Sequence, residues 1–334
     1  MGWVKSESCS FVSRLSDDET VVALTVTFFP GWASFKTTEL PESLDALPFM
    51  TTLDVIGARN LEGEISSWLF ETKHMVQLEL PHNSLAARTN FSDVFKMRSL
   101  KYLDLGDNQM AGNLDRRIGQ AKNMKSLKLS NNHFHGTLPP EVGDIHLSQL
   151  FLSNNAITGR LPDFFGRTQQ SLEIFLLDDN QLTGTVPELT NAPFIDWIDL
   201  GGNFLEGTIP ESMFSLSTMA TLHLQGNALT GPVSRDISKL ENLFFLDLSS
   251  NQLTGNVPSE LGSIFGLLEL DLRDNHFEGE MPEEVCRKTE PSNTFILDYL
   301  VADCRPDEGG DTEIICSCCS LCCDRNGGQC FEQT

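Results

Sequence analysis

Residues 243–258 read Leu-Phe-Phe-Leu-Asp-Leu-Ser-Ser-Asn-Gln-Leu-Thr-Gly-Asn-Val-Pro. Leu246 and Leu248 lie two positions apart, so in an extended chain they share one face while Asp247 points to the other. Leu253 adds a further apolar side chain where the chain turns back. The stretch predicts a short strand, a turn and a return segment, and one such unit is too small to bury its own leucines.

The asparagine of this stretch recurs along the chain at intervals of 23–25 residues. A period held this regularly over most of the chain indicates a solenoid, in which each unit buries its apolar edge against its neighbours. The strands of successive units should then lie side by side in a parallel sheet. The recurring asparagines are Asn83, Asn108, Asn132, Asn155, Asn180, Asn203, Asn227, Asn251 and Asn275.

The amide side chain of these asparagines suits the place where a strand leaves the sheet. Backbone groups of a buried turn lack strand partners, and an amide offers both donors and an acceptor. From Asn108 onward a glycine follows four residues after each asparagine, as at Gly255, and it would permit a tight bend or a close backbone approach. We therefore expect stacked asparagines to tie each turn to the next.

These residues resemble the plant-type leucine-rich repeat, Leu-x-x-Leu-x-Leu-x-x-Asn-x-Leu-x-Gly-x-Ile-Pro-x-x-Leu-Gly, found in receptor-kinase ectodomains, receptor-like proteins and polygalacturonase inhibitors. The resemblance implies an α/β repeat solenoid, a right-handed horseshoe of about 10–11 turns with a parallel sheet on its concave face and little regular helix. It also implies three parts. Residues 1–48 would form an N-terminal cap and degenerate first repeat, 49–285 the leucine-rich repeats, and 286–334 a Cys-rich C-terminal cap and tail.

Charge and motif content exclude several classes of function. The chain has 23 Lys and Arg against 47 Asp and Glu, a net charge of −24, which argues against nucleic acid or an anionic membrane as partner. Its longest apolar stretch, Val21–Phe29, is too short to span a bilayer, so membrane association would need a segment absent from this chain. The sequence has no phosphate-binding loop, kinase signature or nucleophile elbow, so we expect neither catalysis nor a cofactor.

Eight of the nine cysteines fall within residues 286–334. So short a segment cannot form its own core and needs crosslinks or a metal. Four disulfides are possible, with Cys286 and Cys304 expected to bridge around the last apolar turn, and a zinc or copper(I) thiolate cluster is the alternative. The Cys-rich tail also resembles those of secreted or surface leucine-rich-repeat proteins of unicellular algae. Its cysteines are Cys286, Cys304, Cys316, Cys318, Cys319, Cys322, Cys323 and Cys330.

The start of the chain bears on localisation. Trp3 and Cys9 resemble the remnant of a Cys-x-Trp-x-Gly-Val-x-Cys cap, whose first cysteine would precede Met1. The resemblance implies an extracellular or cell-surface protein with a signal peptide or anchor upstream. A free thiol at Cys9 in an intracellular protein is the alternative. Asn90, in Asn-Phe-Ser, is a candidate glycosylation acceptor.

Two outward-facing positions of each strand lie four and six residues before the recurring asparagine. In neighbouring turns they should align as two columns, and in the middle turns they carry apolar and aromatic residues beside aspartates and a histidine. An exposed apolar patch with a charged rim indicates a partner site, unless neighbouring residues cover it. The predicted site comprises Phe151, Ile174, Leu176, Trp197, Asp199, His223, Phe245, Asp247 and Asp271.

The leading hypothesis is a non-catalytic recognition module that binds a protein, peptide or glycan on its concave face. The acidic column suggests a basic or polyhydroxyl ligand, and His223 beside aspartates suggests pH-dependent binding. The resemblance implies a role in signalling or defence. An inhibitor of a secreted hydrolase and an intracellular scaffold with a metal-binding cysteine tail are the alternatives.

Overall fold

The structure of the 334-residue chain is a computed structural model. The chain forms two compact units, Met1–Thr158 and Gly159–Thr334. Side chains are described from residue 49 onward, and the backbone also for two strands before it. The residues that the structure describes are 9–15, 21–28, 49–58, 61–86, 91–162, 171–190, 192–290, 296–304, 314–323 and 330–332.

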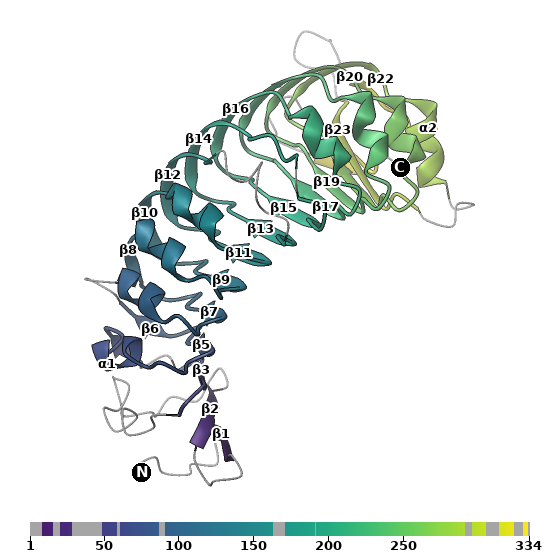
Figure 1. Ribbon diagram of the computed structural model, residues 1–334. Coiled ribbons are helices and arrows are strands. Elements are labelled where there is room, and N and C mark those ends of the chain that lie inside the picture. The colour runs from purple at the N-terminus through teal and green to yellow at the C-terminus, as the bar shows by residue number, and fades with distance from the viewer. Residues whose placement is uncertain are drawn as a thin grey trace. The chain divides into compact units, whose positions relative to one another are not determined.

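Short strands lie side by side along the first unit, one from each turn (Figure 1). An antiparallel hairpin of β1 (Cys9–Leu15) and β2 (Val21–Phe28) begins the sheet, and β2 pairs in parallel with β3 (Thr52–Ile56). Parallel pairing then continues through β5 (Gln77–Glu79), β7 (Tyr102–Asp104), β9 (Ser126–Lys128) and β11 (Gln149–Phe151). The return segments carry β4 (Glu62–Gly63), β6 (Ser84–Leu85), β8 (Ala111–Asn113), β10 (His133–Thr137) and β12 (Ala156–Arg160).

The second unit repeats this arrangement. Its main sheet consists of β13 (Ile174–Leu176), β15 (Trp197–Asp199), β17 (Thr221–His223), β19 (Phe245–Asp247), β21 (Glu269–Asp271), β23 (Tyr299–Asp303), β25 (Leu321–Cys323) and the antiparallel β26 (Cys330–Glu332). Its return segments carry β14 (Gln181–Thr185), β16 (Phe204–Gly207), β18 (Ala228–Gly231), β20 (Gln252–Asn256), β22 (His276–Glu280) and β24 (Ile314–Ile315).

Helix in the described residues occurs only as short segments between the two kinds of strand. The α-helical turns are α1 (Ser67–Phe70) and α2 (Glu283–Cys286). The 3-10 segments are Phe91–Lys96, Arg116–Gln120, Pro140–Asp144, Glu211–Ser215, Arg235–Lys239, Ser259–Ser263 and Arg287–Thr289. The stack of parallel strands with little helix confirms the predicted repeat solenoid.

Rows of leucine form the core of each unit. Leu222, Leu246 and Leu270 align in register through β17, β19 and β21, and each is at most 1% exposed. Each such side chain contributes about 2 kcal/mol when it is buried. Because every row is covered by the turns before and after it, the stability of a turn depends on its neighbours.

The recurring asparagines lie at the strand exits and bond across turns. Asn251 Nδ2 donates to the carbonyl oxygens of Leu248 and Ser249 in its own turn, at 3.1 Å each, and to that of Leu224 in the preceding turn at 2.9 Å. Its Oδ1 accepts the backbone N–H of Leu229 at 3.0 Å. The same set of contacts occurs at Asn108, Asn132, Asn155, Asn203, Asn227 and Asn275.

Each recurring asparagine is preceded by a residue with a positive φ. These residues run from His82 to Asp274, and their φ values lie between 51° and 64°. Asp, Asn or Gly occupies most of these places, and these residues adopt the left-handed region at the lowest cost. Ser250 has a φ of 52° without that advantage. The local sequence of the turn is therefore matched to the geometry that presents the asparagine.

A second parallel ladder, which the sequence analysis did not predict, runs along the return segments. Within β20 and β22, Gly255 pairs with Phe277, and Gly255 has a φ of 79°. This recurring glycine was expected to permit a tight bend or a close backbone approach. In the folded chain the glycine lies within the strand, where its conformation lets consecutive return segments pair.

The parallel ladder continues where the sequence repeat has ended. Tyr299 of β23 pairs with Glu269 of β21, and Val301 pairs with Leu321 of β25. Leu300 is fully buried against the last leucine row. The Cys-rich segment thus adds strands that cover the apolar end of the main sheet.

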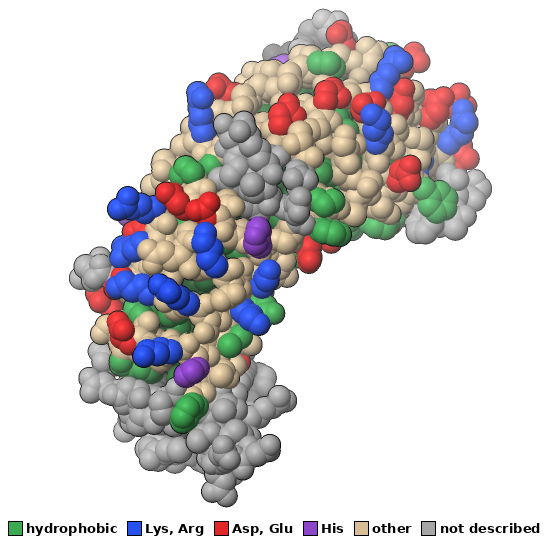
Figure 2. Space-filling model, in the orientation of Figure 1, with side chains coloured by type: hydrophobic (Ala, Val, Ile, Leu, Met, Phe, Trp, Pro, Cys, Tyr) green, Lys and Arg blue, Asp and Glu red, His purple; other side chains and the backbone are tan. Residues whose placement is uncertain are grey.

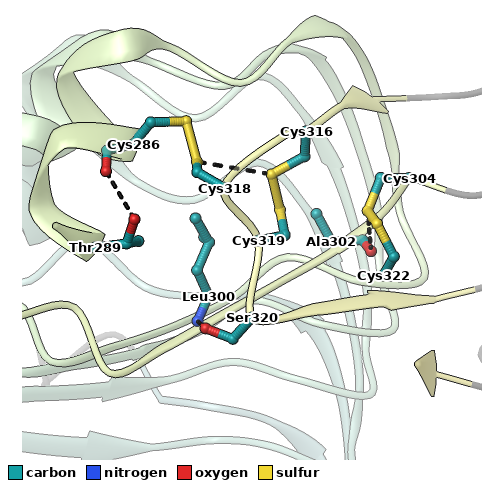
Figure 3. The surroundings of a disulfide bond; sticks show 10 residues. All are labelled: Cys286, Thr289, Leu300, Ala302, Cys304, Cys316, Cys318, Cys319, Ser320 and Cys322. Carbon is teal, nitrogen blue, oxygen red and sulfur yellow. Dashed lines mark hydrogen bonds between the residues drawn. A yellow bond between two sulfur atoms is a disulfide. The ribbon is translucent and has the colours of Figure 1, made fainter. Parts of the chain in front are cut away.

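Four disulfides hold this end together, and their pairing corrects the expected Cys286–Cys304 bridge. Figure 3 shows the bonds Cys286–Cys318, Cys304–Cys322 and Cys316–Cys319. Cys304 follows β23 and reaches the neighbouring strand β25 at Cys322, with 5.1 Å between their Cα atoms. Cys286, at the end of α2, bonds to Cys318. Only the addition of β25 beside β23 brings these partners together. The other pairs are Cys316–Cys319 and Cys323–Cys330.

Candidate functional site: the strand face of the second unit

The outward-facing residues of the second unit's main sheet form two columns. We call the first the aromatic column, because it includes Trp197, Phe245 and Tyr299, and the second the aspartate column. Parallel register places the members of each column on consecutive strands. The aromatic column is Ile174, Trp197, Thr221, Phe245, Glu269 and Tyr299, and the aspartate column is Leu176, Asp199, His223, Asp247, Asp271 and Val301, of which Asp271 and Val301 are buried.

Large apolar side chains of the aromatic column are accessible. Trp197 is 40% exposed and Tyr299 is 38% exposed, while Ile174 and Phe245 are half-buried. Thr221, between Trp197 and Phe245, is buried at 9% exposure. The column therefore presents aromatic side chains on alternate strands, with Thr221 between the first two and Glu269 between the last two.

Tyr299 was missed by the sequence analysis, which ended the columns at Asp271. The signal that could have revealed it is Leu297-x-x-Leu300-x-Ala302, which matches Leu243-x-x-Leu246-x-Leu248 except for its last residue. No asparagine follows at the usual distance, so the asparagine count alone overlooked this strand. The register between β21 and β23 shows that Tyr299 extends the aromatic column by one strand.

The aspartates have a structural role that the sequence analysis also missed. Asp199, Asp247 and Asp271 each accept, through Oδ1, the backbone N–H of the residue two positions later, at 2.9–3.1 Å. Asp104 makes the same 3.0 Å contact in the first unit. A carboxylate at the end of a strand thus fixes the start of the turn, as short polar side chains commonly do.

His223 and Asp199 form a pair on adjacent strands, with 3.1 Å between Nδ1 and Oδ2. Burial disfavours the imidazolium, but the hydrogen bond to Asp199 and the charges of Asp199, Asp247 and Asp178 outweigh it. The pKa of His223 consequently lies above its ordinary value of 6.5. The aspartate column can therefore gain a positive charge as the pH falls toward neutrality and below.

Asp271 is the most shifted carboxyl of this face. Burial, with the charge of Asp247, raises the pKa of Asp271 to about 6, against the opposing influence of Arg273. The Arg273 guanidinium lies 3.2 Å from Asp271 Oδ2. Two neighbouring carboxylates on this face thus resist being charged together.

This shift predicts a pH-dependent contribution to stability. Between about pH 4 and 6 Asp271 has lost its proton in the unfolded chain but keeps it in the folded one, so raising the pH favours unfolding. Asp271→Asn keeps an acceptor for the Arg273 N–H and removes the charge. Urea unfolding should show that this variant gains on the order of 1–2 kcal/mol relative to the parent as the pH rises from 4 to 7. Parallel pH profiles would contradict the prediction, and Glu280→Gln, at an exposed position, is the control.

Phe151, a predicted member of the site, belongs to the first unit, where it ends β11. The Lys128 ammonium lies over its ring, 5.1 Å from the centroid. The same column of the first unit contains Glu79 and Asp104, and burial raises the pKa of both. The remaining eight predicted residues all lie in the second unit, within the two columns.

The described residues also bear on the metal, glycosylation and membrane sites considered from the sequence. The eight cysteines of the tail are paired in disulfides, so they offer no thiolate for the metal cluster considered as an alternative. No group of three or more His, Cys, Asp or Glu in the described ranges could hold a metal ion. Asn90 lies outside the described residues. Within those residues no helix has the length and apolarity required to cross a bilayer.

Comparison with known proteins identifies the repeat. Family models for the leucine-rich repeat match residues 193–253 and, separately, 123–145, 146–168 and 266–287. Receptor-like protein 39 of Arabidopsis thaliana is 33% identical over 183 residues, which cover 54% of this chain but only 20% of that protein. The chain therefore corresponds to a fraction of such a relative.

Solved structures agree. The crystal structure of a TDR receptor is similar with a TM-score of 0.70 and 27% identity, covering 79% of this chain and 44% of that one. The Arabidopsis receptor kinase HAESA, solved with the peptide hormone IDA and the co-receptor SERK1, gives a TM-score of 0.54 at 26% identity, with 74% and 49% covered. The chain thus contains leucine-rich repeats and is similar to plant receptor-like proteins and to the solved structures of plant leucine-rich-repeat receptors.

Proposed function

We propose that this chain is the recognition part of an extracellular or cell-surface protein, and that it binds a polypeptide partner on the strand face of its second unit without catalysing a reaction. The observation that carries the proposal is the aromatic column, in which Trp197 and Tyr299 are exposed on a sheet face beside charged residues. Exposed tryptophan and tyrosine are the residues most enriched at the energetic centres of protein interfaces.

Two further observations support this proposal. Similar structures include a receptor solved with a peptide hormone, and the related proteins are receptor-like proteins, which favours a role in signalling or defence. The four disulfides fit an oxidising compartment. The division into cap, repeats and Cys-rich tail, at residues 48 and 285, belongs to the same proposal.

The test is selection of binding peptides from a random phage-displayed peptide library against the full chain. Affinities of the selected peptides are then measured by fluorescence anisotropy. Trp197→Ala combined with Phe245→Ala should weaken binding about tenfold or more, since two anchors are truncated.

The matched control is Phe204→Ala. Phe204 is 63% exposed in the same unit but lies in β16, on the return segments. The proposal is refuted if the selected peptides bind the double variant as tightly as the parent, or if Phe204→Ala abolishes their binding instead. Either result would place the binding site away from the strand face.

A further inference from the structure

We infer that the partner of the strand face is a basic polypeptide segment, whose Lys or Arg side chains lie along the aspartate column while apolar side chains contact Trp197 and Phe245. The inference rests on the proposed function and specifies the chemistry of the partner. Three observations support it: the charge of the strand face, the geometry of the turns and the spacing of the columns.

The strand face of the second unit is strongly acidic. Apart from Asp303, which is 3% exposed, eight carboxylate residues lie on or directly beside the strands β13 to β23, of which Asp271 is itself buried, against a single arginine, Arg273, within the described residues. A surface of one sign attracts partners of the other and speeds their association. The eight residues are Glu173, Asp178, Asp196, Asp199, Asp247, Glu269, Asp271 and Asp298.

The first unit does not share this surplus. Its corresponding positions combine Asp54, Glu79 and Asp104 with Lys101, Lys125 and Lys128. On the molecular face in Figure 2, blue Lys and Arg side chains likewise gather over the part of the first unit around β8 to β10. The acidity is therefore a property of the second unit rather than of the repeat.

The turns do not require aspartate at the end of the strand. Strand β9 ends in Lys128, β13 in Leu176 and β17 in His223, and each of these strands pairs in register with its neighbour. The fold thus tolerates basic, apolar and aromatic residues where Asp199, Asp247 and Asp271 stand. A carboxylate is one way to start the turn, so a run of them adds charge that the turn does not require.

Mutual repulsion makes a cationic neighbour favourable. Asp247 adds to the raised pKa of Asp271, and Asp199 already attracts the ring of His223. A Lys or Arg side chain placed between these strands would lower the free energy of the carboxylates, since an opposite charge favours the ionised form. An acidic or uncharged ligand, including a neutral glycan, would leave the repulsion in place.

The spacing of the columns specifies how the segment lies. Trp197 with Asp199 and Phe245 with Asp247 occupy β15 and β19, which are two strands apart. Neighbouring strands are about 4.8 Å apart, so the two pairs lie about 10 Å apart. A polyproline-type extended chain brings a side chain to the same face every three residues, about 9 Å. A segment crossing the strands in this conformation would therefore place a basic or apolar contact at every third residue.

The peptides selected from the random library decide the inference. Selected sequences should be enriched in Lys and Arg, with apolar residues recurring at intervals of three. Asp199→Asn with Asp247→Asn should weaken binding of the labelled peptides about tenfold, because both changes remove a negative charge. The amide oxygen of each asparagine can still accept the turn N–H. The control is Glu278→Gln with Glu280→Gln, which alters net charge equally but lies in β22 on the return segments.

The pH dependence of peptide binding provides an independent test. Lowering the pH from 7.5 to 5 protonates Asp271, whose pKa is about 6 and which faces Asp247 and Arg273. It also favours the charged form of His223, which faces Asp199, Asp247 and Asp178. The face loses negative charge, so binding of the same labelled peptides should fall several-fold, and His223→Gln with Asp271→Asn should reduce that fall.

Each other outcome overturns a definite claim. Neutral or acidic peptides that depend on Trp197 would refute the basic partner while leaving the proposed function standing. If the Asp199/Asp247 and the Glu278/Glu280 variants lose peptide affinity equally, the effect comes from net charge alone. The claim that the peptide binds along the aspartate column would then be refuted. Peptides indifferent to Trp197, Phe245 and the aspartates would refute both proposals.

Discussion

Asn251→Ala should destabilise the second unit by about 2 kcal/mol, because the buried Leu229 N–H loses its acceptor and three carbonyl groups each lose one of their two donors. The carbonyls belong to Leu248, Ser249 and Leu224, and the N–H belongs to Leu229, so the loss falls on two consecutive turns. Urea unfolding followed by circular dichroism measures the change.

Asn256→Ala is the matched control, since Asn256 ends the next strand segment, β20, and is exposed. We expect it to change the free energy of unfolding by less than about 0.5 kcal/mol. If the two alanine variants unfold at the same urea concentration, the hydrogen bonds of Asn251 contribute no more to stability than an exposed amide side chain does. Hydrogen exchange should also show that Asn251→Ala accelerates the Leu229 and Leu253 amides before distant ones.

Removal of the Cys304–Cys322 disulfide by a double alanine substitution should cost about 3 kcal/mol. The bond closes a loop with a sequence separation of 18, and loss of a crosslink of this length increases the entropy of the unfolded chain by about that amount. It also ties β23 to β25, which covers the last leucine row. Thermal unfolding of the oxidised variant and parent measures the effect.

Cys316→Ala with Cys319→Ala is the comparison, because that bond has a sequence separation of only 3 and should contribute about 2 kcal/mol in the same treatment. Peptide mapping under non-reducing conditions verifies the four pairs beforehand. A Cys304/Cys322 variant as stable as the parent would show that the end of the sheet is held by packing alone.

The stacked architecture could be predicted because the constraint is local and repeated. Leu246 and Leu248 specify one buried face, Asn251 marks the strand exit, and the same pattern one turn away can only be satisfied by parallel stacking. The two columns followed from the same period, which is why eight of the nine predicted residues fall into them in the second unit. The second ladder was missed because the glycine within β20 and β22 resembles a turn residue in sequence.

Other features depended on neighbours that the sequence does not specify. Tyr299 joins the aromatic column only because β23 pairs beside β21. The role of Asp247 at its turn and the raised pKa of Asp271 arise from burial and from charges on adjacent strands. Phe151 shared the sequence pattern but lies in the first unit next to Lys128.

The sequence by itself determined the repeat, its buried leucines and the asparagine at every strand exit, because each of these is imposed by a short-range pattern with one stacking solution. Tertiary structure decided which cysteines bond, how far the aromatic column extends and which carboxylates repel one another. Those properties depend on distances between residues that are far apart in the chain, and only strand pairing sets such distances.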